Sequence, residues 1–146
     1  MSQKSGIKNP TAFKNKMKKR LVENPERHLK KLIQQATTLV EGEAKASIMK
    51  GGSGITYQKY NPRRQHTASA AGEPPASDTG FLVGSISSSV RSQGSTVIGQ
   101  IVASAPYAKH LEFGTSNIEP RPYMQPALER NRPFIKRMFK QKGYVR

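Results

Sequence analysis

The spacing of hydrophobic residues predicts two helices at the beginning of the chain. Asn9 and Pro10 form a typical helix start, with the asparagine as cap and the proline at the first helical position. Phe13, Met17 and Leu21 follow at intervals of four, so a short amphipathic helix is expected here. Its apolar stripe is more typical of a helix that packs on protein than of one that binds a membrane.

A longer helix is predicted directly after the first. Asn24 and Pro25 repeat the start signal. The apolar stripe behind them keeps a helical period and consists of Leu29, Leu32, Ile33, Ala36, Leu39, Val40 and Ala44. The glycines at positions 51, 52 and 54 should end this helix, because glycine is costly to hold in a helical conformation.

Residues 55–84 show no sustained helical or strand period. Loops of this length are uncommon in a small domain unless they bind something or are disordered, so we expect an extended arm that becomes ordered on assembly. The arm interleaves aromatic and basic residues, Tyr57, Tyr60, Arg63 and Arg64. Such residues stack on bases and grip phosphates, or they anchor a contact with a neighbouring subunit. The second interpretation is favoured, since tyrosine and arginine are typical interface anchors.

Two segments rich in β-branched residues predict an antiparallel hairpin. They are residues 85–91 and residues 96–103, with a turn at residues 92–95 between them. In the second strand apolar residues point to both sides of the chain. Both faces of that strand are therefore expected to be covered.

Two further helices are predicted near the C-terminus. Pro106 starts a short helix that Gly114 ends. A last helix after Pro126 should bury Leu128, Ile135, Met138 and Phe139 and expose Arg130, Arg132, Lys136 and Lys140. The predicted fold class is α+β, with a long N-terminal helix and a C-terminal helix packed on a small antiparallel β-sheet and a long extended arm. Residues 24–146 would form this single domain, and residues 1–23 a basic N-terminal extension.

The net charge of +16 is unevenly distributed. Basic side chains crowd residues 1–31 and residues 130–146, whereas residues 73–129 carry more acids than bases. Basic ends of this kind contact DNA or an acidic protein surface, or they simply keep the chain solvated. The candidates for DNA contact are Lys14, Lys16, Lys18, Lys19, Arg20, Lys136, Lys140 and Lys142.

No residue pattern indicates catalysis, a metal or a cofactor. The chain has no cysteine, and His28, His66 and His110 lie in different segments without an acidic pair at metal-ligand spacing. A Gly-x-Ser-x-Gly turn is missing, and the glycines at residues 51–54 lack the lysine of a phosphate loop. No apolar run is long enough to span a membrane. We expect a protein that is not an enzyme, binds no cofactor or small-molecule substrate and has no membrane partner.

Three stretches of the chain carry a recognisable combination of residues. They are Gly-Glu-Pro-Pro at 72–75 with Asp-Thr-Gly-Phe-Leu at 78–82, Tyr-Ala-Lys-His-Leu-Glu-Phe-Gly-Thr at 107–115, and Arg-Pro-Tyr-Met-Gln-Pro-Ala-Leu at 121–128. In order and spacing they resemble the neck and tail-completion proteins of long-tailed bacteriophages, the family typified by the tenth gene product of a lambdoid coliphage. The resemblance covers about residues 66–130 and leaves the N-terminal extension outside.

The resemblance implies a structural virion protein, a head-tail connector whose copies form a homo-oligomeric ring in the neck or at the head-proximal end of the tail. We expect a hexamer or a dodecamer, made in the host bacterial cytoplasm, that contacts other phage neck and tail proteins. Contact with the phage genomic DNA is left open. The candidates for subunit interfaces are Tyr57, Tyr60, Arg63, Arg64, Tyr107, Glu112, Phe113, Arg121 and Tyr123. The alternative is a free DNA-binding protein that uses its two cationic ends.

Glu112 is expected to form an ion pair with Arg121. A carboxylate in the last turn of a helix is unfavourably placed against the helix dipole unless a cation holds it. Pro120 and Pro122 keep Arg121 in an extended segment just beyond the turn at Gly114. The pair would then fix that turn, within the subunit or across the ring interface.

Overall fold

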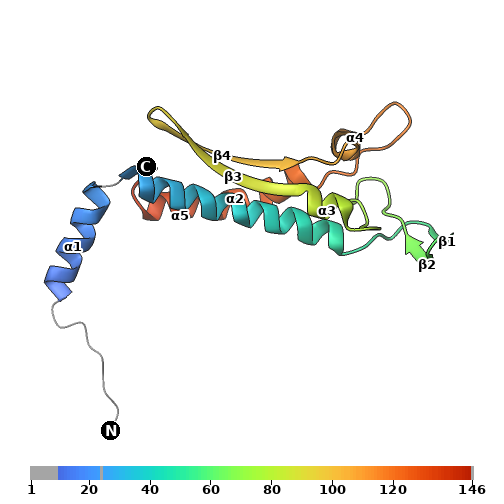
Figure 1. The fold of residues 1–146 in the computed structure, drawn as a ribbon, viewed down its shortest axis with the longest axis horizontal. Coiled ribbons are helices and arrows are strands. Elements are labelled where there is room, and N and C mark those ends of the chain that lie inside the picture. Colours follow the sequence, from blue (N-terminus) through green and yellow to red (C-terminus); the bar gives the residue numbers. More distant parts are fainter. Residues whose placement is uncertain (1–9, 24, 146) are drawn as a thin grey trace, which may run out of the picture.

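The computed structural model describes residues 10–23 and 25–145. Along this part of the chain, helices alternate with two antiparallel strand pairs (Figure 1). The elements are α1 (Pro10–Glu23), α2 (Pro25–Met49), β1 (Thr56–Tyr60), β2 (Arg63–Thr67), α3 (Phe81–Ser85), β3 (Ile86–Gln93), β4 (Thr96–Ala103), α4 (Ala108–Phe113) and α5 (Met124–Gln141). The fold is α+β, as predicted from the sequence.

The long helix α2 is the centre of the fold. The ribbon β3–β4 lies along one side of α2, and α5 lies along another (Figure 1). The hairpin β1–β2 and the helix α4 lie near the C-terminal end of α2, whereas α1 extends away from its N-terminal end. The C-terminal helix thus packs on α2 rather than on the sheet, which corrects the predicted packing.

The buried core follows one face of α2. Val40, Ala44 and Ile48 recur at every fourth position and are buried, because this spacing keeps side chains on one face of a helix. Their buried neighbours come from the ribbon, from α3 and from the C-terminal third of the chain, and are Leu82, Ile86, Ala105, Ala108, Tyr123 and Ala127. The apolar stripe predicted for this helix is confirmed at Leu32, Ala36, Val40 and Ala44, whereas Leu39 is 39% exposed.

The predicted hairpin is confirmed as the ribbon β3–β4, with a shorter turn. Ile86 pairs with Ala103 and Gln93 with Thr96, so two residues close the turn. The first of them, Gly94, has a φ of 59°, which the turns of two-residue hairpins require. The expectation that both faces of β4 are covered is wrong. One face lies on α2, and Val102 on the other is exposed, because no element of the described chain packs over it.

The long extended arm is not confirmed. Its first half forms the hairpin β1–β2, with Thr56 opposite Thr67, and α3 begins at Phe81. Between these elements Ser69 is buried, and Ser77 donates its N–H to the carbonyl oxygen of Ile48 at 3.1 Å. The hairpin carries few apolar side chains, and its strands pair through the backbone, so it produced no hydrophobic period.

Both C-terminal helices are present, with one difference in burial. Gly114 ends α4 with a φ of 72°, a conformation that favours glycine. The helix α5 begins two residues before Pro126, and proline is tolerated in a first turn. Ile135 and Phe139 are partly buried, as predicted, but Leu128 is 45% exposed.

The close approach of the ribbon to α2 depends on Gly99 in β4. A Cβ atom at this position would lie 2.5 Å from Cγ2 of Ile33 and 2.6 Å from Cγ2 of Thr37. Both side chains branch at Cβ, so they are stiff in a helix and cannot turn away easily. Glycine is therefore required here for packing rather than for a turn.

We predict that Gly99→Ala lowers the free energy of unfolding by about 1–3 kcal/mol, the usual cost of overpacking. The matched control is Gly42→Ala on the exposed side of α2, where a new Cβ would meet nothing within 4 Å. That change should raise stability by up to about 1 kcal/mol, because alanine favours a helix. Urea unfolding followed by circular dichroism measures both. Equal stability of Gly99→Ala and the unaltered protein would contradict the packing argument.

Candidate functional site

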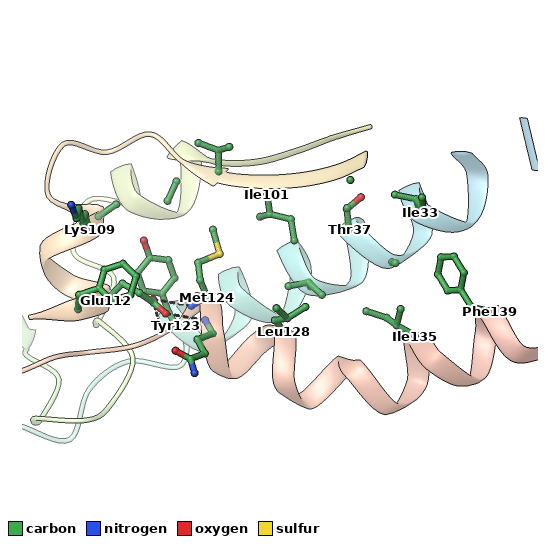
Figure 2. A pocket seen from close by; sticks show the side chains of 18 residues that line it. Ile33, Thr37, Ile101, Lys109, Glu112, Tyr123, Met124, Leu128, Ile135 and Phe139 are labelled. Carbon is green, nitrogen blue, oxygen red and sulfur yellow. Dashed lines mark hydrogen bonds between the residues drawn. The ribbon is translucent and has the colours of Figure 1, made fainter. Parts of the chain in front are cut away.

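An open apolar groove is the most prominent candidate site. It has a volume of about 850 Å³ and runs between α2, β4 and α5, with α4 at one end (Figure 2). Figure 2 shows Ile101 above the groove, Ile33 on α2, and Leu128, Ile135 and Phe139 along α5. Val40 also lines it.

The groove arises from the way the two layers pack on one helix. The ribbon and α5 both rest on α2, and each uses a different side of it. Small residues, Ala36 and Gly99, line the groove where α2 and β4 meet. The space between β4 and α5 is therefore not filled by side chains of the described chain.

The groove offers a ligand little besides apolar contact. The hydroxyl group of Thr37 donates to the carbonyl oxygen of Gln34 at 3.0 Å, so it is already satisfied within α2. Charged and amide side chains, Lys109, Glu112 and Gln125, gather at the end of the groove where α4 meets α5. A partner would thus be recognised mainly by shape and apolar surface.

At this end, Glu112 caps the helix that follows it. Its carboxylate accepts hydrogen bonds from the backbone N–H groups of Tyr123, Met124 and Gln125 at 2.9, 3.0 and 2.9 Å. The first N–H groups of a helix have no partner within the helix, and a negative charge there is favoured by the helix dipole. The last turn of α4 therefore supplies the N-terminal cap of α5.

The predicted ion pair between Glu112 and Arg121 does not form within the described subunit. The guanidinium group of Arg121 instead donates to the hydroxyl oxygen of Ser69 at 2.9 Å, and its backbone N–H donates to the carbonyl oxygen of Leu111 at 2.7 Å. The sequence pattern suggested a basic side chain as the partner of the Glu112 carboxylate. Its partners are instead the first backbone N–H groups of α5, and a local residue pattern does not show which backbone groups a carboxylate will meet.

The three stretches that carry the family resemblance meet at this junction. Gly72 donates its N–H to the carbonyl oxygen of Pro120 at 3.1 Å, which ties the first stretch to the residue directly before the third. The rings of Phe81 and Tyr107 lie 6.2 Å apart, which brings the first stretch to the second. Tyr123 is 2% exposed, and burial, together with the nearby Glu112 carboxylate, raises the pKa of its phenol to about 12. Its hydroxyl group is therefore uncharged at neutral pH.

A second polar cluster holds the hairpin β1–β2 to the body. The carboxylate of Asp78 binds the ammonium group of Lys59 and the guanidinium group of Arg64, whose Nη1 also donates to the Asp78 carbonyl oxygen at 2.7 Å. Nδ1 of His66 lies 3.7 Å from the same carboxylate. The hydrogen bond from Lys59 is the main cause that holds the pKa of Asp78 below its usual range, and the charge of Arg64 adds to it.

The predicted interface residues divide into two groups. Exposed or partly exposed side chains that remain candidates for a partner are Tyr57, Tyr60, Arg63, Tyr107 and Phe113. Arg64, Glu112 and Arg121 are engaged within the subunit, and Tyr123 belongs to its core. Sequence reasoning missed the groove, although α2 has more apolar positions than one packing face requires.

The basic residues proposed for DNA contact are largely exposed where they are described. Exposed members are Lys14, Lys16, Lys18, Lys136, Lys140 and Lys142. The side chains of Lys19 and Arg20 lie outside the described part of the structure. Among the described residues, no group of three His, Cys, Asp or Glu side chains is arranged to hold a metal ion, and no helix has the length and apolar character of a membrane span.

Comparisons with protein-family models, with curated proteins and with solved structures gave no significant match to this chain.

We predict that Glu112→Ala lowers the free energy of unfolding by about 1–2 kcal/mol, the usual cost of losing a helix cap. Glu129→Ala in α5, the helix that Glu112 caps, is the matched control, because Glu129 is exposed and its carboxylate accepts a hydrogen bond from Gln125 one turn earlier. The control should change stability by less than about 0.5 kcal/mol. Thermal unfolding followed by circular dichroism compares the two. Similar losses in both variants would count against the capping role.

Asp78→Asn should loosen the hairpin β1–β2 while leaving the ribbon intact, because it removes the charge that Lys59 and Arg64 share. The pKa of Asp78 is lowered in the folded protein. The stability that the charged carboxylate gives the hairpin is therefore complete above the ordinary pKa of about 4 and is lost as the pH falls below that value. Amide hydrogen exchange of residues 56–67 measures the effect. Glu119→Gln, at an exposed loop position, is the control. Unchanged exchange in Asp78→Asn would show that other contacts hold the hairpin.

Proposed function

We propose that this protein is a structural subunit of a bacteriophage head-tail connector, which forms a ring in the neck or at the head-proximal end of the tail. The observation that carries the proposal is the apolar groove between α2, β4 and α5. An open apolar groove is typical of a contact with another protein or with an apolar ligand, and we assign this one to a neighbouring subunit.

A ring suits this surface better than an isolated two-fold dimer. A groove on one subunit and a protruding segment on another can make a head-to-tail contact, and such contacts form a ring when the rotation between copies closes. Phe113 is 69% exposed in α4 beside the groove, and Tyr60 is 79% exposed at the tip of β1–β2. These residues provide further apolar surface for neighbouring copies or for other neck and tail proteins. A hexamer or a dodecamer is the stoichiometry we propose.

The use of the resembling stretches also supports a structural role. The carboxylate of Glu112 caps α5, the guanidinium group of Arg121 binds Ser69, and the N–H of Gly72 binds Pro120. All three contacts hold the subunit's own segments together. Of the three, Glu112 lines the end of the groove, where its cap holds the first turn of α5 in place as part of the contact surface. None of these contacts requires a reaction, so we propose that the protein is not an enzyme.

Binding to DNA is the second candidate function. The specific observation in its favour is the exposed basic face of α5, which carries Arg130, Arg132, Lys136, Arg137 and Lys140. Such a face can neutralise phosphates regardless of sequence. In a connector it would contact the genome that passes through the ring, whereas in a free DNA-binding protein it would be the main site.

Sedimentation velocity of the purified chain, combined with DNA titration at several salt concentrations, separates the two functions. The connector predicts a discrete oligomer that Leu128→Glu dissociates, because a charge would enter the apolar groove. The control Gln100→Glu changes an exposed residue of β4 and should leave the oligomer intact. A monomer that binds DNA tightly, with an affinity that falls steeply with salt, would reject the connector and favour the alternative.

A further inference from the structure

We infer that the groove between α2, β4 and α5 receives the helix α1 of a second copy of this chain. The inference rests on the proposed connector function and names the partner of its docking surface. Two apolar surfaces of the same chain are left without a partner in the described structure. One is the groove, and the other is the apolar face of α1.

The helix α1 carries its own unsatisfied apolar surface. Phe13 and Met17 lie one turn apart on the same face, and each is 49% exposed. Figure 1 shows α1 extending away from the rest of the fold. A helix of 14 residues is only marginally stable alone in water, so it needs a surface to pack on.

The dimensions of the helix and of the groove agree. The wall of the groove formed by α5 runs from Met124 to Phe139, which corresponds to about 24 Å at the helical rise of about 1.5 Å per residue. With its 14 residues, α1 is about 21 Å long by the same rule. The groove can therefore accept the whole helix along its length.

The connection between α1 and α2 prevents α1 from occupying the groove of its own chain. To lie along the groove it would have to fold back antiparallel to α2. Antiparallel helices are joined by loops of about two to five residues. Only position 24 separates α1 from α2, and Pro25 follows it at the start of α2. Docking must therefore occur between copies.

An exchange of this kind is directional. Each copy donates one helix and accepts another, an exchange that either a reciprocal dimer or a closed ring satisfies. The proposed connector function selects the ring, in which each copy passes its helix to the next one. The helix α1 then acts as the connecting arm of the assembly, a role that the sequence pattern assigned to residues 55–84.

Charge makes this interface distinguishable from DNA binding. Lys14, Lys16 and Lys18 on α1 and the exposed basic residues of α5 would lie on the same side of the assembly and repel one another. Salt screens repulsion between exposed charges, so added salt should strengthen the docking of α1. Binding to DNA has the opposite dependence.

Disulfide trapping between two separately produced variants tests the inference, and the chain offers a background without cysteine. The full-length variants Met17→Cys and Leu128→Cys are mixed under mild oxidation, and cross-linked peptides are identified by mass spectrometry. Only a contact between copies can join the two positions. The control replaces Met17→Cys with Asn15→Cys, which lies on the opposite face of the same helix.

We expect the Met17 and Leu128 positions to cross-link severalfold more than the Asn15 and Leu128 positions. The double variant Phe13→Ser with Met17→Ser should raise the dissociation constant of the oligomer about a hundredfold. Lys14→Ser with Lys18→Ser, on the polar side of α1, should leave it unchanged or lower it.

A discrete oligomer that forms without this cross-link, and that tolerates the Phe13 and Met17 changes, would overturn the inference and leave the connector function standing. The groove would then be free for another partner, such as a helix of a different neck protein. A chain that stays monomeric and gives no cross-link would overturn both.

Discussion

The whole arrangement depends on the packing of two layers against a single helix. The ribbon β3–β4 and α5 have few contacts with each other, and both are held by α2. Val40, Ala44 and Ile48 supply the apolar contacts, and Gly99 allows β4 to approach the helix closely. Because a cylinder cannot fill the wedge between two surfaces that rest on different sides of it, this architecture leaves a groove. The candidate site is thus a direct consequence of the fold.

The few acidic residues of this basic chain hold distant segments together. Glu112 caps α5, and Asp78 ties the hairpin to the loop before α3. Glu73 accepts hydrogen bonds from Ser53 and from the backbone of Ala70, and so closes the loop after the hairpin. These three carboxylates are therefore engaged inside the subunit, and the excess of positive charge remains on the surface, where it repels or attracts partners.

The small core and the open groove fit the proposed subunit, which neighbouring copies would complete. In the proposed ring, the surface that one copy leaves open is covered by another, and the basic face of α5 remains available to the genome. Burial on assembly would add apolar contact to a chain of 146 residues that carries a net charge of +16. The same physical requirement accounts for α1, which has an apolar face but no place to bury it within its own chain.

Sequence alone determined the elements whose apolar residues recur with a regular period. It predicted α2, the ribbon β3–β4, α4 and α5, because a helix or strand with one buried face leaves that period in the residue pattern. It did not predict the hairpin β1–β2, whose strands are mostly polar and are held by Asp78 from another segment. The cap that Glu112 provides and the groove beside it were decided only by tertiary structure. Both depend on which distant backbone groups and side chains come together, and no local pattern records that.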